Sequence, residues 1–138
     1  MEITELHNKQ KGNIAEAIVE LDLKIKGYSV FKELGDLSKI DLIAEKNGQI
    51  IRLQVKGITP NENGSLHLRA IKTGPNYSFK YTEDMFDYFA VVDLISKQVG
   101  YIPSNIFGEQ NNIHLRVRDT TNNQTNKVRY LKDYLLSP

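Results

Sequence analysis

The chain has 138 residues, no cysteine and a formal net charge of +1 at pH 7. This length suits one domain, spanning residues 1–138, with a core of its own, and the missing cysteines exclude disulfide bonds and thiolate metal ligands. The near-neutral charge excludes a strongly basic surface, and the acidic N-terminus without a long apolar run excludes a signal peptide or a membrane span, so we expect a cytoplasmic protein with no membrane partner.

The first predicted element is an amphipathic helix from Asn8 to Lys26. Gly27 follows it at the place where a glycine commonly ends a helix. The apolar residues at helical spacing are Ile14, Ala15, Ile18, Leu21 and Ile25. We expect this stripe to pack on a sheet. After the helix, residues 28–31 predict a short strand and residues 33–37 a turn.

The next element is a β-hairpin over residues 39–56. Asn47-Gly48 is a typical two-residue hairpin turn because both turn positions require a positive φ angle. If Lys46 faces Gln49 across the turn, the two residue numbers of every facing pair in the hairpin sum to 95. Asp41 is then expected opposite Gln54. Lys56 shares their face because side chains alternate along a strand.

The rest of the chain predicts further strands and short helices. An alternating run at 65–72 follows a polar loop at 59–64 and is expected to extend the same sheet. The apolar run at 88–95 predicts a strand buried on both faces. The other expected elements are a helical turn at 82–85, strands at 98–102 and 113–118, a short helix at 103–107, a loop at 120–126 and a closing helix at 129–136.

Four residues of this pattern suit metal-dependent phosphodiester hydrolysis. Mg²⁺ prefers oxygen ligands and keeps several waters, so one or two carboxylates and an amide form a sufficient site. Asp41 and Gln54 provide such ligands on the hairpin, and Glu16 lies at the edge of the helix stripe that docks on the sheet. Lys56 would orient the attacking water or stabilise charge on phosphorus. Each of the four is also compatible with an ordinary solvent-facing role.

These residues, in this order, resemble the PD-(D/E)XK nuclease superfamily: a helix glutamate, a strand aspartate and the Gln54-Val55-Lys56 element. A narrower resemblance, to the group I intron-encoded homing endonucleases, extends over residues 9–107. The segments that carry it are residues 11–16, 27–30, 40–43, 52–56, 86–92 and 100–103. Two departures are Ile40, where a proline often precedes the aspartate, and Gln54 in place of an acid.

The resemblance implies an α/β (α+β) fold with a restriction-endonuclease-like α-β-β-β-α-β core and a central mixed sheet flanked by helices. It also implies Mg²⁺-dependent cleavage of double-stranded DNA, with Mn²⁺ as a substitute, by a homodimer or homotetramer. The implied catalytic residues are Glu16, Asp41, Gln54 and Lys56, of which the first three would hold the metal. The loss of a carboxylate at Gln54 is expected to weaken binding of a second cation.

Local basic residues are the candidate DNA contacts: Lys9, Lys11, His67, Arg69, Arg116 and Arg118. A site-specific homing enzyme is the first functional hypothesis. A Holliday-junction resolvase and a repair or restriction nuclease share the same chemistry and stay open as alternatives. A non-catalytic DNA-binding module, which has lost turnover through Gln54, is the alternative from another class. The tyrosines Tyr77, Tyr81 and Tyr130 are compatible with stacking or backbone contacts, although tyrosines are more often half-buried packing residues.

Overall fold

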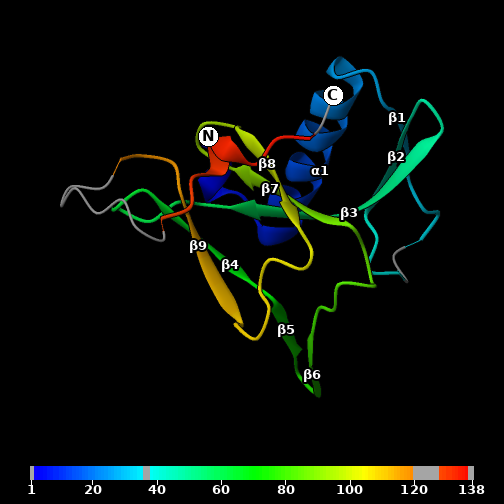
Figure 1. Cartoon of the computed structure of the whole chain (residues 1–138). Coiled ribbons are helices and arrows are strands. Elements are labelled where there is room, and N and C mark those ends of the chain that lie inside the picture. Colours follow the sequence, from blue (N-terminus) through cyan, green and yellow to red (C-terminus); the bar gives the residue numbers. More distant parts are fainter. Residues whose placement is uncertain (1, 36–37, 120–127, 137–138) are drawn as a thin grey trace.

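The computed structural model describes residues 2–35, 38–119 and 128–136. Its central feature is a five-stranded sheet with helix α1 (Asn8–Ile25) packed on one face (Figure 1). In spatial order the strands are β1 (Ser29–Phe31), β2 (Leu42–Lys46), β3 (Gln49–Ile58), β7 (Tyr88–Asp93) and β8 (Val99–Pro103). β3 and β7 are parallel and the other neighbours are antiparallel, so the sheet is mixed as expected.

Two small antiparallel sheets accompany the central one. One pairs β4 (Ser65–Arg69) with β9 (Asn112–Arg116), and the other pairs β5 (Ile71–Gly74) with β6 (Tyr77–Lys80). The prediction that residues 65–72 extend the central sheet is therefore wrong. The run breaks at Ala70, whose N–H donates to the Asn111 carbonyl and whose carbonyl accepts from the Tyr81 N–H. These long-range bonds direct the chain from one small sheet to the other.

Helix α1 has the predicted length, and Gly27 follows it with a φ of 92°. Its buried residues, however, are Ala15, Val19 and Leu23. The expectation that Leu21 and Ile25 pack on the sheet is wrong, because these side chains are 60% and 76% exposed. The sheet instead contacts the neighbouring stripe of the helix, whose buried residues are four positions apart and so also lie on one side of the helix.

Two predicted helices are wrong. Residues 103–107 form the end of β8 and the turns that follow it. In the segment 129–136 the helical structure is limited to the 3₁₀ turn η2 (Leu131–Asp133). Another 3₁₀ turn, η1 (Ile3–Glu5), precedes α1. The loop predicted at 120–126 lies outside the described residues.

The fold class is confirmed as a mixed α+β architecture. Within the described ranges α1 is the α-helix of the fold, and β4, β5 and β6 occupy the connection between β3 and β7 where the implied order has a second helix. None of the helices in those ranges combines the length and apolar character needed to cross a bilayer.

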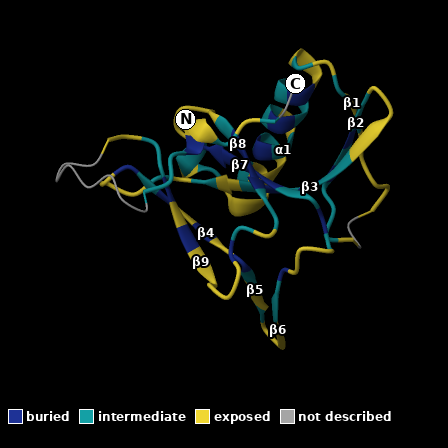
Figure 2. Ribbon diagram, in the orientation of Figure 1, coloured by how far each residue is buried: buried dark blue, intermediate teal, exposed yellow. Residues whose placement is uncertain are grey.

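The core lies on both faces of the central sheet (Figure 2). Between α1 and the sheet, Ala15 and Val19 pack with Leu53 and Ala90. On the opposite face, strands β4 and β9 contribute the apolar side chains that cover Phe89 and Val91 of β7: Leu66, Leu68, Ile113 and Leu115. This burial on both faces explains the continuous apolar sequence of β7, as predicted.

Candidate active site

The β2–β3 hairpin has the predicted register from its turn up to the pair Leu42–Leu53. The ladder ends there, one pair short of the predicted backbone pairing of Asp41 with Gln54. The Asp41 N–H instead donates to the Leu53 carbonyl at 2.8 Å, and Asp41 Oδ2 accepts from the Val55 N–H at 2.8 Å. The carboxylate thus takes the place of a backbone acceptor, which fixes Asp41 against β3 beside Gln54.

Three of the predicted site residues line one cavity of about 290 Å³: Glu16 from α1, Asp41 before β2, and Gln54 from β3. Glu16 follows Ala15, which is fully buried against the sheet. A Cβ at Gly57 of β3 would lie only 2.9 Å from the Ala15 Cβ, so the helix approaches this strand closely. This close approach brings a carboxylate of α1 to the hairpin.

Lys56 lies two residues after Gln54 on the same face of β3. Its Nζ donates to the Tyr81 hydroxyl oxygen at 3.3 Å and lies 4.9 Å from the centroid of that ring. Burial lowers the pKa of Lys56, the nearby Lys72 lowers it further, and Asp41 opposes both effects. Burial and the Asp41 charge raise the pKa of Tyr81. Tyr81 lines the cavity, and Lys56 is linked to it through this contact with the phenol.

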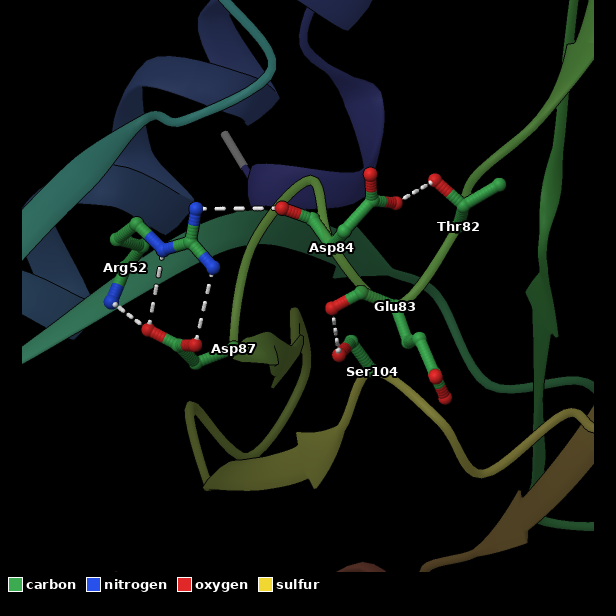
Figure 3. Close-up of polar contacts among 6 residues, drawn as sticks. All are labelled: Arg52, Thr82, Glu83, Asp84, Asp87 and Ser104. Carbon is green, nitrogen blue, oxygen red and sulfur yellow. Dashed lines mark hydrogen bonds and ion pairs between the residues drawn. The ribbon is translucent and has the colours of Figure 1, made fainter.

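The segment after Tyr81 is tied to β3 (Figure 3). The Arg52 backbone N–H donates to Asp87 Oδ2 at 2.8 Å, and its guanidinium donates to both oxygens of that carboxylate at 3.3 and 3.2 Å. Arg52 also donates to the Asp84 carbonyl, and the Ser104 hydroxyl donates to the Glu83 carbonyl. These bonds hold residues 82–87 next to the part of β3 that carries the site.

The oxygen donors suit a hard divalent cation. Among the residues that the structure describes, no group of three or more His, Cys, Asp or Glu side chains has an arrangement that could hold a metal ion. The cavity is lined by the carboxylates of Glu16, Asp41 and Glu33 and by the amide of Gln54. These oxygen donors fit a hard divalent cation such as Mg²⁺ better than a softer metal.

The predicted DNA-contacting residues lie on separate elements. Lys9 and Lys11 are in the first turns of α1, whereas His67 and Arg69 are on the exposed face of β4, where His67 stacks on His114 with ring centroids 4.9 Å apart. Two further basic residues lie at the end of β9 or shortly after it and donate to backbone carbonyls. They are Arg116, which donates to the carbonyls of Asn63, Arg118 and Asp119, and Arg118, which donates to the Glu62 carbonyl.

Tyr81 and Lys72 also line the cavity, and sequence reasoning placed neither in the catalytic set. Both belong to the β5–β6 region. Their approach to β3 depends on the break at Ala70, for which the alternating sequence pattern gives no signal. A tyrosine in a polar and aromatic stretch is more typical of packing, and Tyr81 does pack against Phe86 and Phe89.

The cavity brings together a carboxylate from α1, a carboxylate directly before β2 and the glutamine of the Gln-x-Lys element on β3, as expected for a nuclease of the class that the sequence resembles. In agreement, the chain belongs to the PD-(D/E)XK endonuclease family, whose model matches residues 6–137. The fold is similar to that of a bacterial homing endonuclease, I-Ssp6803I, at a TM-score of 0.78 and 23% sequence identity over 88% of this chain and 86% of that chain. No curated protein sequence matches significantly.

Proposed function

We propose that this family member is a Mg²⁺-dependent endonuclease that hydrolyses phosphodiester bonds of double-stranded DNA at a specific site, as a homing enzyme does. The observation that supports this proposal most directly is the shared cavity of Glu16, Asp41 and Gln54. The Lys56 ammonium adds a positive charge beside the same residues. Carboxylates and a lysine at one cavity are the groups that phosphodiester cleavage requires.

In this proposal Glu16, Asp41 and Gln54 hold the metal, and Mn²⁺ can replace Mg²⁺. A bound divalent cation supplies an activated water and neutralises charge on the phosphate. The Val55 N–H keeps the Asp41 carboxylate oriented, because it donates to Oδ2. The Lys56 side chain stabilises the negative charge that develops on phosphorus or orients the attacking water.

DNA contacts are assigned to Lys9 and Lys11 on α1 and to His67 and Arg69 on β4. The contacts of Arg116 and Arg118 with backbone carbonyls favour a role in holding the loop at 61–64 rather than in direct DNA binding. One active site cuts one strand, so cleavage of both strands requires at least a homodimer, and a homotetramer satisfies the same need.

Supercoiled plasmid and a four-way junction, incubated with Mg²⁺, Mn²⁺ or EDTA, test the activity. We expect metal-dependent cleavage by the parent protein and a loss of at least about 100-fold in Asp41→Ala and Lys56→Ala. Asp133→Ala, which changes an exposed acid on η2, is the matched control and is expected to cleave normally. Cleavage that survives in Asp41→Ala at equal protein purity would contradict the assignment.

One observation favours a second function, namely a DNA-binding module without turnover: Gln54 replaces the acid that the superfamily pattern has. Binding of DNA by the parent without cleavage in any metal would support that alternative. Cleavage-site selection from a randomised DNA library separates the remaining nuclease hypotheses. A homing enzyme would select one long sequence, whereas a junction resolvase would prefer the four-way junction with little sequence preference.

A further inference from the structure

We propose that Tyr81 is a positioning residue for Lys56, holding the lysine ammonium group beside the cavity with its hydroxyl oxygen and its ring. This inference rests on the proposed nuclease function and adds to it a residue outside the helix, the hairpin and the Gln-x-Lys element. Tyr81 lines the cavity together with Glu16, Asp41 and Gln54. It therefore lies at the cavity and contacts the lysine.

The contact with Tyr81 defines the place of the ammonium group. Lys56 Nζ lies 3.3 Å from the Tyr81 hydroxyl oxygen, as donor to it, and 4.9 Å from the centroid of the same ring. A lysine side chain has four rotatable bonds, so a hydrogen bond to a phenol that is itself held in place restricts where Nζ can lie.

The tyrosine itself is firmly held. It is only 5% exposed, and its ring makes edge-to-face contacts with Phe79, Phe86 and Phe89 at centroid distances of 5.3, 5.6 and 5.7 Å. Its backbone N–H donates to the Ala70 carbonyl at 2.7 Å. A side chain held by packing and backbone bonds can act as a fixed support for a flexible one.

The support is also linked to the strand that carries the lysine. Tyr81 contacts Phe89 of β7, and Phe89 is paired with Gln54 of β3. The aromatic contacts of Tyr81 therefore reach the residue pair two positions before Lys56. The segment after Tyr81 is bonded to β3 through Arg52 and Asp87 (Figure 3). The position of the phenol relative to β3 is therefore fixed from both sides.

Tyr81→Phe tests the proposal because it removes the hydroxyl and keeps the packed ring. We expect kcat to fall about 10- to 100-fold with KM for DNA unchanged, since a misplaced catalytic group weakens the transition state rather than substrate binding. Tyr77→Phe is the matched control, with the same chemical change on a half-exposed ring at the start of β6, the strand that precedes Tyr81. It is expected to leave kcat and the thermal unfolding midpoint unchanged.

A double-mutant cycle separates positioning from general disturbance. If Tyr81 acts through Lys56, Tyr81→Phe causes no further loss in a Lys56→Ala background. The full loss in that background, or a parent-like kcat in Tyr81→Phe alone, overturns the proposal.

Crystal structures of the parent and of Tyr81→Phe provide a readout that needs no activity. The Lys56 Nζ is expected to move by about 1 Å or more in the variant, the scale at which misplacement affects catalysis. An unchanged Nζ position overturns the proposal whatever the rate. If the parent cleaves no DNA, the proposed function fails, while the position of Nζ still decides whether Tyr81 holds it.

Discussion

Replacing Gly57 by alanine is a direct test of the spacing between α1 and β3. A Cβ at this position would lie 2.9 Å from the Ala15 Cβ and 3.1 Å from Leu94 Cδ2. The leucine side chain can rotate, but the Ala15 Cβ moves only with the helix backbone. Restoring an ordinary contact of 3.4 Å requires a displacement of about 0.5 Å. Because Glu16 is the next residue, its carboxylate would shift with the helix.

Gly57→Ala is expected to lower the free energy of unfolding by about 1–2 kcal/mol. Overpacking costs roughly 1–3 kcal/mol, and replacing a strand glycine returns about 0.5–1 kcal/mol of backbone entropy. With a urea m-value of about 2 kcal/mol/M, the urea midpoint would fall by roughly 0.5–1 M at an unchanged slope. Cleavage is expected to fall about 10- to 100-fold, because the Glu16 carboxylate moves with the helix away from its position relative to Asp41 and Gln54.

Two further variants test whether the contact with Ala15 causes the loss of stability and of cleavage. Gly12→Ala makes the same change at an exposed helix position with no atom within 4 Å, and it is expected to raise stability by about 0.5–1 kcal/mol with cleavage unchanged. In the double variant Ala15→Gly with Gly57→Ala the close contact is relieved, so cleavage is expected to recover. A Gly57→Ala protein with parent-like stability and cleavage would refute the close approach of α1 to β3.

Three other outcomes follow from the site and its surroundings. Asp41→Asn keeps an acceptor for the Val55 N–H but loses the charge, so filter binding should show normal DNA affinity while cleavage falls at least about 100-fold. Burial raises the pKa of Asp87, but the hydrogen bonds and charge of Arg52 outweigh it and hold that pKa below 3.8. Asp87→Asn should therefore lower stability by about 1 kcal/mol near pH 7, and the gap in urea midpoint should close as the pH falls below 3.8 through the folded-state pKa. A gap that persists in acid would contradict the ion pair. Arg116→Ala should lower the thermal unfolding midpoint measured by calorimetry, because it removes the bond to the Asn63 carbonyl. Arg69→Ala should leave that midpoint unchanged. In salt titrations Arg69→Ala should weaken DNA binding and reduce the dependence of binding on salt.

The hairpin was predictable because its determinants are local. Asn47 and Gly48 adopt φ angles of 54° and 81°, as a two-residue turn requires, and this turn sets the register of every pair up to Leu42–Leu53. Asp41 comes one residue before this ladder, and its place beside Gln54 depends on the bonds of its N–H and its carboxylate to Leu53 and Val55. The helix was predictable for a similar reason, since its periodicity and Gly27 lie within one segment.

The remaining features depend on contacts between distant segments. The predicted stripe of α1 correctly includes Ala15, but the buried stripe continues through Val19 and Leu23 rather than through Leu21 and Ile25, because the helix packs on the sheet through that side. The break at Ala70 depends on bonds to Asn111 and Tyr81. Sequence patterns contain no information about these partners, so Tyr81 could not be placed in the site from the sequence.

Anomalous diffraction from crystals of the DNA complex grown with Mn²⁺ tests whether Glu16, Asp41 and Gln54 hold a divalent cation at a nuclease site. If they do, we expect an anomalous peak in the cavity, bound by oxygen atoms of these three residues and next to a DNA phosphate. A Mn²⁺ ion and a phosphate bound elsewhere on the protein would contradict this assignment.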